Sequence, residues 1–284
     1  MRKRILFASS PEAAAVAERI DELMASAGFR MIKVTPRTVA GVLRYGRFEG
    51  FVKRVDAGNW IKGIADRIRG SRASRALRGA EWLERAGFAH PRPMAAAEWR
   101  RWGAIQTSYM ISEALVEARI LSEFALTDGR NFRRRKWISE RLARELRRLH
   151  EAGLYTRDLQ ETNLMLASEG GEITVYFVDL EDFRRAWRVS QRRRMINLVH
   201  LDRSIGRFVS RTQRTRFLYN YLGGNPGREE ARRLVARISE IRARIEGQGG
   251  GARRIDTSGM ERMPEAASGS VAAAEFPQAR AGKN

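Results

Sequence analysis

Apolar and polar residues in the first part of the chain follow a helical period and then a strand period. Residues 11–27 place apolar side chains at helical spacing between Ser10, a good helix cap, and Gly28, which predicts a helix. Strand-like runs follow at residues 31–34, 39–44 and 51–55. The polar and glycine-bearing turns between these runs predict a small sheet.

A helical pattern returns after the third of these runs. It covers most of residues 58–86 and ends at Gly87. Pro91 and Pro93 then force an extended segment, since proline disfavours helical backbone at the preceding residue. A further strand is predicted at residues 108–112.

The second half of the chain is mainly helical. The best-defined helix covers residues 134–151, with a leucine-rich stripe on one face, and Gly153 ends it. Two apolar runs, 164–166 and 173–178, flank a turn and predict a hairpin. The pattern is then helical as far as residue 246, after which glycine, alanine, serine and proline dominate without periodicity.

This order of elements predicts an α+β fold with two lobes. The expected parts are an N-terminal helical extension (1–29), a small sheet-rich N-lobe (30–115), a larger helical C-lobe (116–246) and a disordered tail (247–284). The two lobes would join near Glu113–Leu115 and share a cleft.

Composition excludes several classes of protein. No run approaches the roughly 18 apolar residues of a membrane-spanning helix, and the apolar stretch after the basic start is too short for a signal peptide. The chain has no cysteine and three scattered histidines, which excludes disulfides and thiolate metal sites and disfavours a histidine-based one. We therefore expect a soluble cytoplasmic protein.

The charge is strongly basic, with 54 lysines and arginines against 33 acidic residues and a formal net charge of +21. Such a surface attracts nucleic acid, anionic lipid or a phosphorylated glycan, although a solvated surface in an arginine-rich protein explains it equally well. Nucleic acid is not the expected partner, because the chain has no aromatic-rich recognition motif or zinc-ligand spacing.

The strongest local pattern follows the glycine that ends the long helix. An Arg157–Asp158 pair comes first, Asn163 lies five residues after Asp158, and the second strand of the predicted hairpin ends at Asp179. Phosphoryl transfer needs one carboxylate that holds the attacking hydroxyl, and further oxygen ligands that hold Mg²⁺ against the phosphates. Mg²⁺ prefers hard oxygen ligands, so an aspartate and an asparagine facing each other across a hairpin suit it.

These residues resemble the catalytic loop and the metal-binding aspartate of protein-kinase-like enzymes. More narrowly, the chain resembles the lipopolysaccharide kinase family, which includes the inner-core heptose and Kdo kinases of Gram-negative bacteria. Further segments that carry this resemblance are residues 71–77, 86–95, 109–113 and 210–222. The resemblance covers most of the chain, residues 30–225, and implies a bilobal protein-kinase-like fold.

The resemblance implies a role for each matching residue. Asp158 would be the catalytic carboxylate, and Asn163 and Asp179 would be the ligands of Mg²⁺. Lys53, on the third predicted strand, would contact the α- and β-phosphates of ATP. The cofactors implied are therefore ATP and Mg²⁺.

The resemblance also implies where the nucleotide and the acceptor bind. The backbone of Glu113, Ala114 and Leu115 would hold adenine. The acceptor would be a hydroxyl of a lipopolysaccharide inner-core sugar or related glycolipid, at the cytoplasmic face of the inner membrane. Anionic lipid there would suit the basic chain. An amphipathic contact is conceivable through Trp60, Ile61, Ile64 and Ile68, although burial against the lobe is the simpler interpretation.

Departures from the kinase pattern keep a second hypothesis open. The usual histidine before the arginine is Thr156, the frequent lysine after the aspartate is Gln160, and residues 35–41 contain no glycine-rich phosphate loop. The glutamate expected to pair with Lys53 is not evident either. The best register places Ala76 there, with Glu81 and Glu84 as imperfect substitutes. The alternative is a kinase-like binding module without catalysis that acts in envelope biogenesis.

Overall fold

The computed structural model describes residues 2–57, 69–127, 132–169, 172–206, 208–224 and 227–248. Residues up to Arg242 form one compact unit, and the second unit begins at Ala243. The predicted helical segment with Trp60, Ile61, Ile64 and Ile68 lies outside the described residues, as does nearly all of the predicted tail. No helix among the described residues is long and apolar enough to cross a membrane.

The N-terminal part of the compact unit is built on a six-stranded antiparallel sheet with the order β1-β5-β6-β4-β3-β2. Its strands are β1 (Arg2–Ala8), β2 (Phe29–Thr35), β3 (Thr38–Tyr45), β4 (Phe48–Asp56), β5 (Pro93–Arg101) and β6 (Ala104–Ser112). The strands predicted at 31–34, 39–44, 51–55 and 108–112 lie within β2, β3, β4 and β6.

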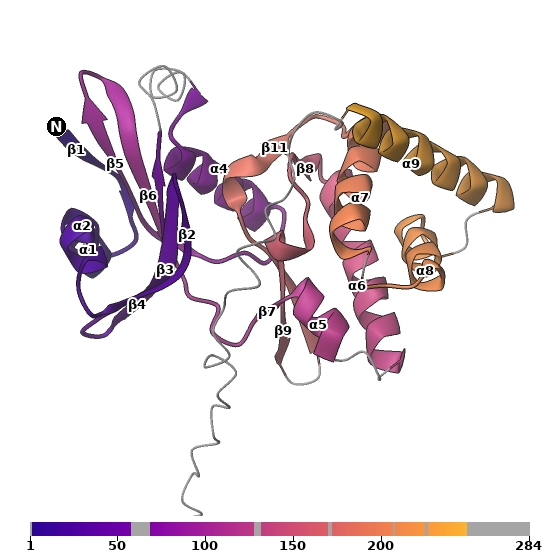
Figure 1. Ribbon diagram of the computed structural model, residues 1–284, viewed down its shortest axis with the longest axis horizontal. Coiled ribbons are helices and arrows are strands. Elements are labelled where there is room, and N and C mark those ends of the chain that lie inside the picture. Colours follow the sequence, from indigo (N-terminus) through magenta and orange to yellow (C-terminus); the bar gives the residue numbers. More distant parts are fainter. Residues whose placement is uncertain are drawn as a thin grey trace, which may run out of the picture. The chain divides into compact units, whose positions relative to one another are not determined.

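Helices cover both faces of this sheet (Figure 1). Helices α1 (Pro11–Glu18) and α2 (Ile20–Met24) lie on one face, and Ser10 caps α1 as predicted by accepting a hydrogen bond from the backbone of Ala13. Helix α4 (Arg72–Arg85) lies on the other face. The side chains of β6 alternate between the two faces of the sheet. Tyr109 and Ile111 pack in the hydrophobic core that includes α1 and α2, and Met110 packs in the core that includes α4.

The first 29 residues, predicted as a helical extension, also contribute a strand to the sheet. Strand β1 pairs with β5 and thereby becomes an edge strand of the sheet, which the sequence did not predict. Residues 2–4 are all charged and β5 carries a run of alanines, so neither segment has the β-branched composition that marks most strands.

The C-terminal part of the unit is mainly helical and contains two small sheets. Its elements are β7 (Arg119–Ile120), α5 (Leu121–Thr127), α6 (Phe132–Glu151), β8 (Leu154–Thr156), η1 (Glu161–Asn163), β9 (Leu164–Glu169), β10 (Glu172–Phe177), η2 (Leu180–Asp182), β11 (Phe183–Arg185), α7 (Gln191–Ile205), α8 (Arg211–Tyr221) and α9 (Arg228–Gln248). The predicted hairpin is the β9–β10 pair. The continuous helical pattern expected after Asp179 is interrupted by η2 and β11, which pairs with β8.

Helix α4 connects the two parts through one close contact. It packs on η2, and a Cβ atom at Gly79 would overlap the carbonyl oxygen of Leu180. Glycine costs helix stability in a helix interior, so its presence here is explained by this approach. The contact fixes η2, and with it Asp179, against the sheet lobe.

Candidate active site

Lys53 and Asp179 meet between the sheet and the helical part. The central strand β4 carries Lys53, and Asp179 follows strand β10. The Nζ atom of Lys53 lies 2.5 Å from Oδ1 of Asp179 and 3.7 Å from Oε1 of Glu181. Residues 126 positions apart in the sequence are thus joined by an ion pair.

The surroundings of Lys53 favour its charged form. Burial alone would lower the pKa of this lysine, because a buried ammonium loses its hydration. The carboxylates of Asp179 and Glu181 outweigh burial and raise the pKa above its usual value. Lys53 is therefore a cation at neutral pH.

The second partner of Lys53 comes from η2 and not from helix α4. Ala76 is only 6% exposed and belongs to the core, and Glu81 pairs with Arg85 on the same helix. The carboxylates that pair with Lys53 are those of Asp179 and Glu181, so neither Glu81 nor Glu84 takes the place expected on α4. Glu181 takes this place. Helix α4 contributes a cation instead, since Arg72 Nη1 lies 2.7 Å from Glu181 Oε1.

Asp179 has an unusual backbone conformation. Its φ and ψ of 57° and 55° lie in the left-handed region, which non-glycine residues adopt rarely. Trp102 is the other such residue in the described part of the chain. Residues held in such conformations concentrate at functional sites, where the surrounding structure imposes them.

The Arg157–Asp158 turn is held by short-range hydrogen bonds. The backbone N–H of Asp158 donates to Oγ1 of Thr156 over 3.2 Å, and the amide of Gln160 donates to Oδ1 of Asp158 over 2.6 Å. Asn163 donates to the carbonyl oxygen of Asp158 over 3.0 Å. The two departures from the kinase pattern, Thr156 and Gln160, thus both position Asp158.

This turn and the end of the hairpin lie side by side. The backbone N–H of Val178 donates to the carbonyl oxygen of Asn163 over 3.0 Å, and that of Arg157 donates to the carbonyl oxygen of Asp182 over 3.1 Å. The side chains of Arg157 and Asp182 also form an ion pair. Asn163 and Asp179 therefore lie at the same end of the hairpin, as the sequence predicted.

A buried polar network holds the residue before the Arg157–Asp158 turn in place. The side chain of Asn197, on α7, donates to the carbonyl oxygen of Thr156 over 2.5 Å and accepts from its N–H over 3.3 Å. His150 contacts the same Asn197 oxygen through Nε2 over 3.1 Å and the hydroxyl of Tyr221 through Nδ1 over 2.7 Å. These partners fix the tautomer, with the proton on Nε2, because the Asn197 oxygen can only accept.

Most of this network could not be predicted from the sequence. His150 has a structural role, whereas Asn197 lies 41 residues from Thr156 and its role depends on the packing of α7. The one local signal was a polar residue among the apolar positions of a buried helix face.

The network makes stability depend on pH. Burial lowers the pKa of His150 to about 4, against about 6.5 in the unfolded chain. Since the folded state then binds fewer protons between these values, stability should be complete above pH 6.5 and should be lost as the pH falls towards 4. The expected loss is about 2 kcal/mol at pH 5. Urea unfolding at pH 7 and pH 5 measures it, and a His150→Gln variant should lose correspondingly less. Equal losses in the two proteins would contradict this role of His150.

The residues near Asp179 suit a magnesium ion. Carboxylate oxygens of Asp179, Glu181 and Asp182 lie within 4.8 Å of one another, and Asn163 adds a carboxamide at the same end of the hairpin. Glu181 and Asp182 each pair with an arginine, whereas Asp179 pairs with Lys53. This all-oxygen donor set fits Mg²⁺ and excludes a soft metal.

The segment 113–115 connects β6 to the helical part. The backbone N–H of Glu113 donates to the carbonyl oxygen of Arg92 over 2.9 Å, and its carboxylate pairs with the Arg92 side chain at 3.2 Å. The Glu113 side chain is thus bonded to Arg92, so a contact with adenine would come from the backbone of this segment.

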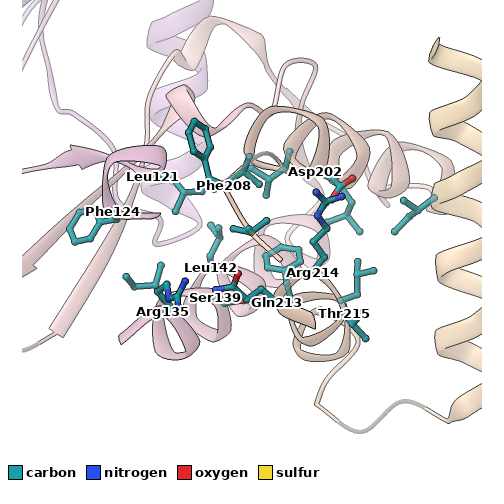
Figure 2. Close-up of a pocket in the computed structure, with 18 of the residues that line it drawn as sticks. Leu121, Phe124, Arg135, Ser139, Leu142, Asp202, Phe208, Gln213, Arg214 and Thr215 are labelled. Carbon is teal, nitrogen blue, oxygen red and sulfur yellow. The ribbon is translucent and has the colours of Figure 1, made fainter. Parts of the chain in front are cut away.

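A large apolar cavity lies elsewhere, among helices α5 to α9 (Figure 2). Its volume is about 590 Å³, and leucine, isoleucine and phenylalanine side chains dominate its walls. Asp202 and Arg214 lie at its edge and pair with each other. None of the predicted site residues lines it, so it is separate from the candidate site around Lys53 and Asp179.

A six-stranded sheet, a helical part and a lysine–aspartate pair joining them define a bilobal protein-kinase-like fold. The fold is similar to that of a solved structure described as WaaP in complex with acyl carrier protein, with a TM-score of 0.63 at 20% identity. The match covers 86% of this chain and 99% of that one.

The family is shown by sequence. The model of the lipopolysaccharide kinase (Kdo/WaaP) family matches residues 60–221, more than half of the chain, so the chain belongs to this family. The resemblance and the fold class that the sequence predicted are thereby confirmed. No curated protein sequence matches the chain at a significant level.

Proposed function

We propose that the protein is a Mg²⁺- and ATP-dependent kinase that phosphorylates a sugar hydroxyl of the lipopolysaccharide inner core or a related glycolipid. The observation that carries this proposal is the 2.5 Å ion pair between Lys53 and Asp179, beside the Asp158–Asn163 turn. Family membership supports a phosphotransferase, and the acidic and carboxamide oxygens support magnesium as its metal.

The arrangement suits in-line transfer. Asp158 would hold the acceptor hydroxyl through the carboxylate oxygen that Gln160 leaves open, because Gln160 binds Oδ1. The acceptor oxygen then forms a bond to the γ-phosphorus while the bond to the β–γ bridging oxygen breaks, and the hydroxyl proton passes to Asp158. ADP leaves with the electron pair of the broken bond.

The remaining residues would bind the donor. Lys53 would contact the α- and β-phosphates, and Asn163 and Asp179 would hold Mg²⁺, which supplies positive charge to the phosphates when bound. The backbone of Glu113, Ala114 and Leu115 would hold adenine. In this scheme the protein works mainly by positioning and electrostatics, as is usual for phosphoryl transfer.

The experiment is transfer of labelled γ-phosphate from ATP to a panel of bacterial acceptors. The panel holds intact lipopolysaccharide, lipid-free core oligosaccharide and a protein substrate such as casein. We expect magnesium-dependent labelling of the two glycans and none of the protein. Nucleotide binding without labelling of any acceptor would favour the alternative, a kinase-like binding module without catalysis. Labelling of casein alone would make the chain a protein kinase.

A further inference from the structure

The segment that follows the active site carries an unusual surface. Six of the eleven residues 184–194 are arginine, and residues 183–201 contain no acidic residue. In the middle of this segment Trp187 is fully exposed, with a relative accessibility of 103%. Arg185, Arg188, Arg192 and Arg193 are exposed as well. These five residues lie within nine consecutive positions of the sequence, and we call them the Trp187 face.

The exposure of Trp187 is imposed by the fold on both sides. Before it, Phe183 is buried, and Ala186 donates a backbone hydrogen bond to the carbonyl oxygen of Gly153 over 2.9 Å. After it, Val189 is buried, and its carbonyl oxygen accepts from Arg194 over 3.3 Å. A large apolar ring is thus held in solvent by a well-bonded segment.

Strand β11 links the Trp187 face to the proposed reaction centre. Strand β11 pairs with β8, whose next residues lead directly to Asp158, and the β8–β11 pair lies between α4 and α7 (Figure 1). Because Phe183 pairs with Thr156 and Arg185 with Leu154, Trp187 lies past the end of the ladder that points away from Asp158. Gly153, which binds Ala186, is five residues before Asp158, a span of at most about 17 Å in extended chain. A partner on this face would therefore contact the protein at a point displaced from Asp158 along β8.

The chemistry of the face fits one partner. Tryptophan is enriched where protein meets the membrane–water interface, because its ring is apolar and its N–H is polar. Arginines beside such a ring are attracted to anionic headgroups. Nucleic acid would also match the charge, but one exposed ring offers no series of stacking platforms for bases.

We propose that the Trp187 face binds the surface of an anionic lipid bilayer and so brings the reaction centre to an acceptor carried on a lipid. The second half of this proposal rests on the function proposed above, whereas the binding itself does not. A sugar carried on a lipid lies above the headgroup layer. If the Trp187 face contacts the bilayer, Asp158 is displaced from that contact along β8, which suits an acceptor at this height.

Vesicle binding tests the proposal with two matched pairs of full-length variants. The first pair is Trp187→Ala and Trp102→Ala, since Trp102 is also highly exposed (92%) and lies next to an arginine, but on the β5–β6 turn. The second is Arg188→Gln with Arg192→Gln, against Arg232→Gln with Arg237→Gln on α9, which removes equal charge from exposed positions. Each is mixed with vesicles of phosphatidylglycerol and phosphatidylcholine in equal parts, and sedimentation gives the bound fraction.

The tryptophan and arginine substitutions should differ in how much they weaken vesicle binding and in how that loss depends on salt. Trp187→Ala should weaken binding about tenfold at any salt concentration, because even partial burial of the ring is worth that much. The Arg188–Arg192 double variant should weaken it about fivefold per arginine at low salt and less at high salt. Both controls should bind as the wild type does.

Several results would overturn the proposal. One is equal binding by Trp187→Ala and Trp102→Ala, which would show only general attraction of a basic protein. Another is unchanged vesicle binding together with Trp187-dependent binding to polyglutamate, which would indicate an acidic protein partner instead. In the transfer assay, Trp187→Ala should lower labelling of vesicle-bound lipopolysaccharide but not of lipid-free oligosaccharide. If wild type labels neither acceptor, the proposed function fails while the vesicle result still decides the surface.

Discussion

Replacing Asp158 with asparagine should lower the rate of phosphoryl transfer by a factor of about 10²–10⁴, the usual contribution of a positioned general base. Asparagine keeps the oxygen that accepts the Gln160 hydrogen bond, so the turn should keep its shape while it loses the group that takes the proton. The affinity for ATP should change little, because in the proposed mechanism Asp158 holds the acceptor and makes no contact with the phosphates. Transfer of labelled phosphate to core oligosaccharide gives the rate, and nucleotide titration gives the affinity.

The control for this variant is Glu140→Gln on helix α6. Glu140 forms a 3.8 Å pair with Lys136 on the surface of the helix, and such pairs contribute little. The control should retain the wild-type rate. A rate for Asp158→Asn within twofold of the control would remove Asp158 from the mechanism.

Replacing Lys53 with methionine should weaken the binding of ATP and lower kcat/KM for ATP. Methionine keeps the length and apolar part of the side chain but removes the charge paired with Asp179. Loss of one preorganised electrostatic contact to a reacting group lowers rates by about 10²–10³, and kcat/KM for ATP should fall by this factor. The binding of ATP should weaken as well, unlike in the Asp158 variant.

The matched control is Lys136→Met, which removes a lysine from the other end of the Glu140 pair. It should leave kcat/KM for ATP unchanged. Urea unfolding of both variants shows whether the loss of the Lys53 charge acts through stability. Unchanged ATP binding and turnover in a folded Lys53→Met protein would exclude the phosphate-binding role of this lysine.

The parts of the site that are local in sequence could be predicted. The spacing from Asp158 to Asn163 is a property of one turn, and the strand that carries Lys53 is marked by its own apolar residues. The hairpin that ends at Asp179 is likewise formed by neighbouring residues. Local pattern is sufficient in these cases because each element forms most of its contacts within a short stretch of chain.

The parts that depend on long-range packing could not be predicted. Strand β1 pairs with β5 about ninety positions further along, and nothing in either segment specifies that partner. The partner of Lys53 was expected on helix α4, but the close contact at Gly79 brings Glu181 of η2 to it instead. Asn197 supports the Arg157–Asp158 turn only because α7 packs against it. In each case the geometry between elements, rather than the element itself, decides the contact.

The most direct test of the central claim is a crystal structure with Mg²⁺ and a non-hydrolysable ATP analogue. The claim is that Lys53, Asp158, Asn163 and Asp179 surround one metal–nucleotide complex. We expect the metal at about 2.1 Å from oxygens of Asn163 and Asp179, with Lys53 on the phosphates and adenine against residues 113–115. Nucleotide bound elsewhere, such as in the apolar cavity of the helical part, or metal bound without Asp179, would contradict the account.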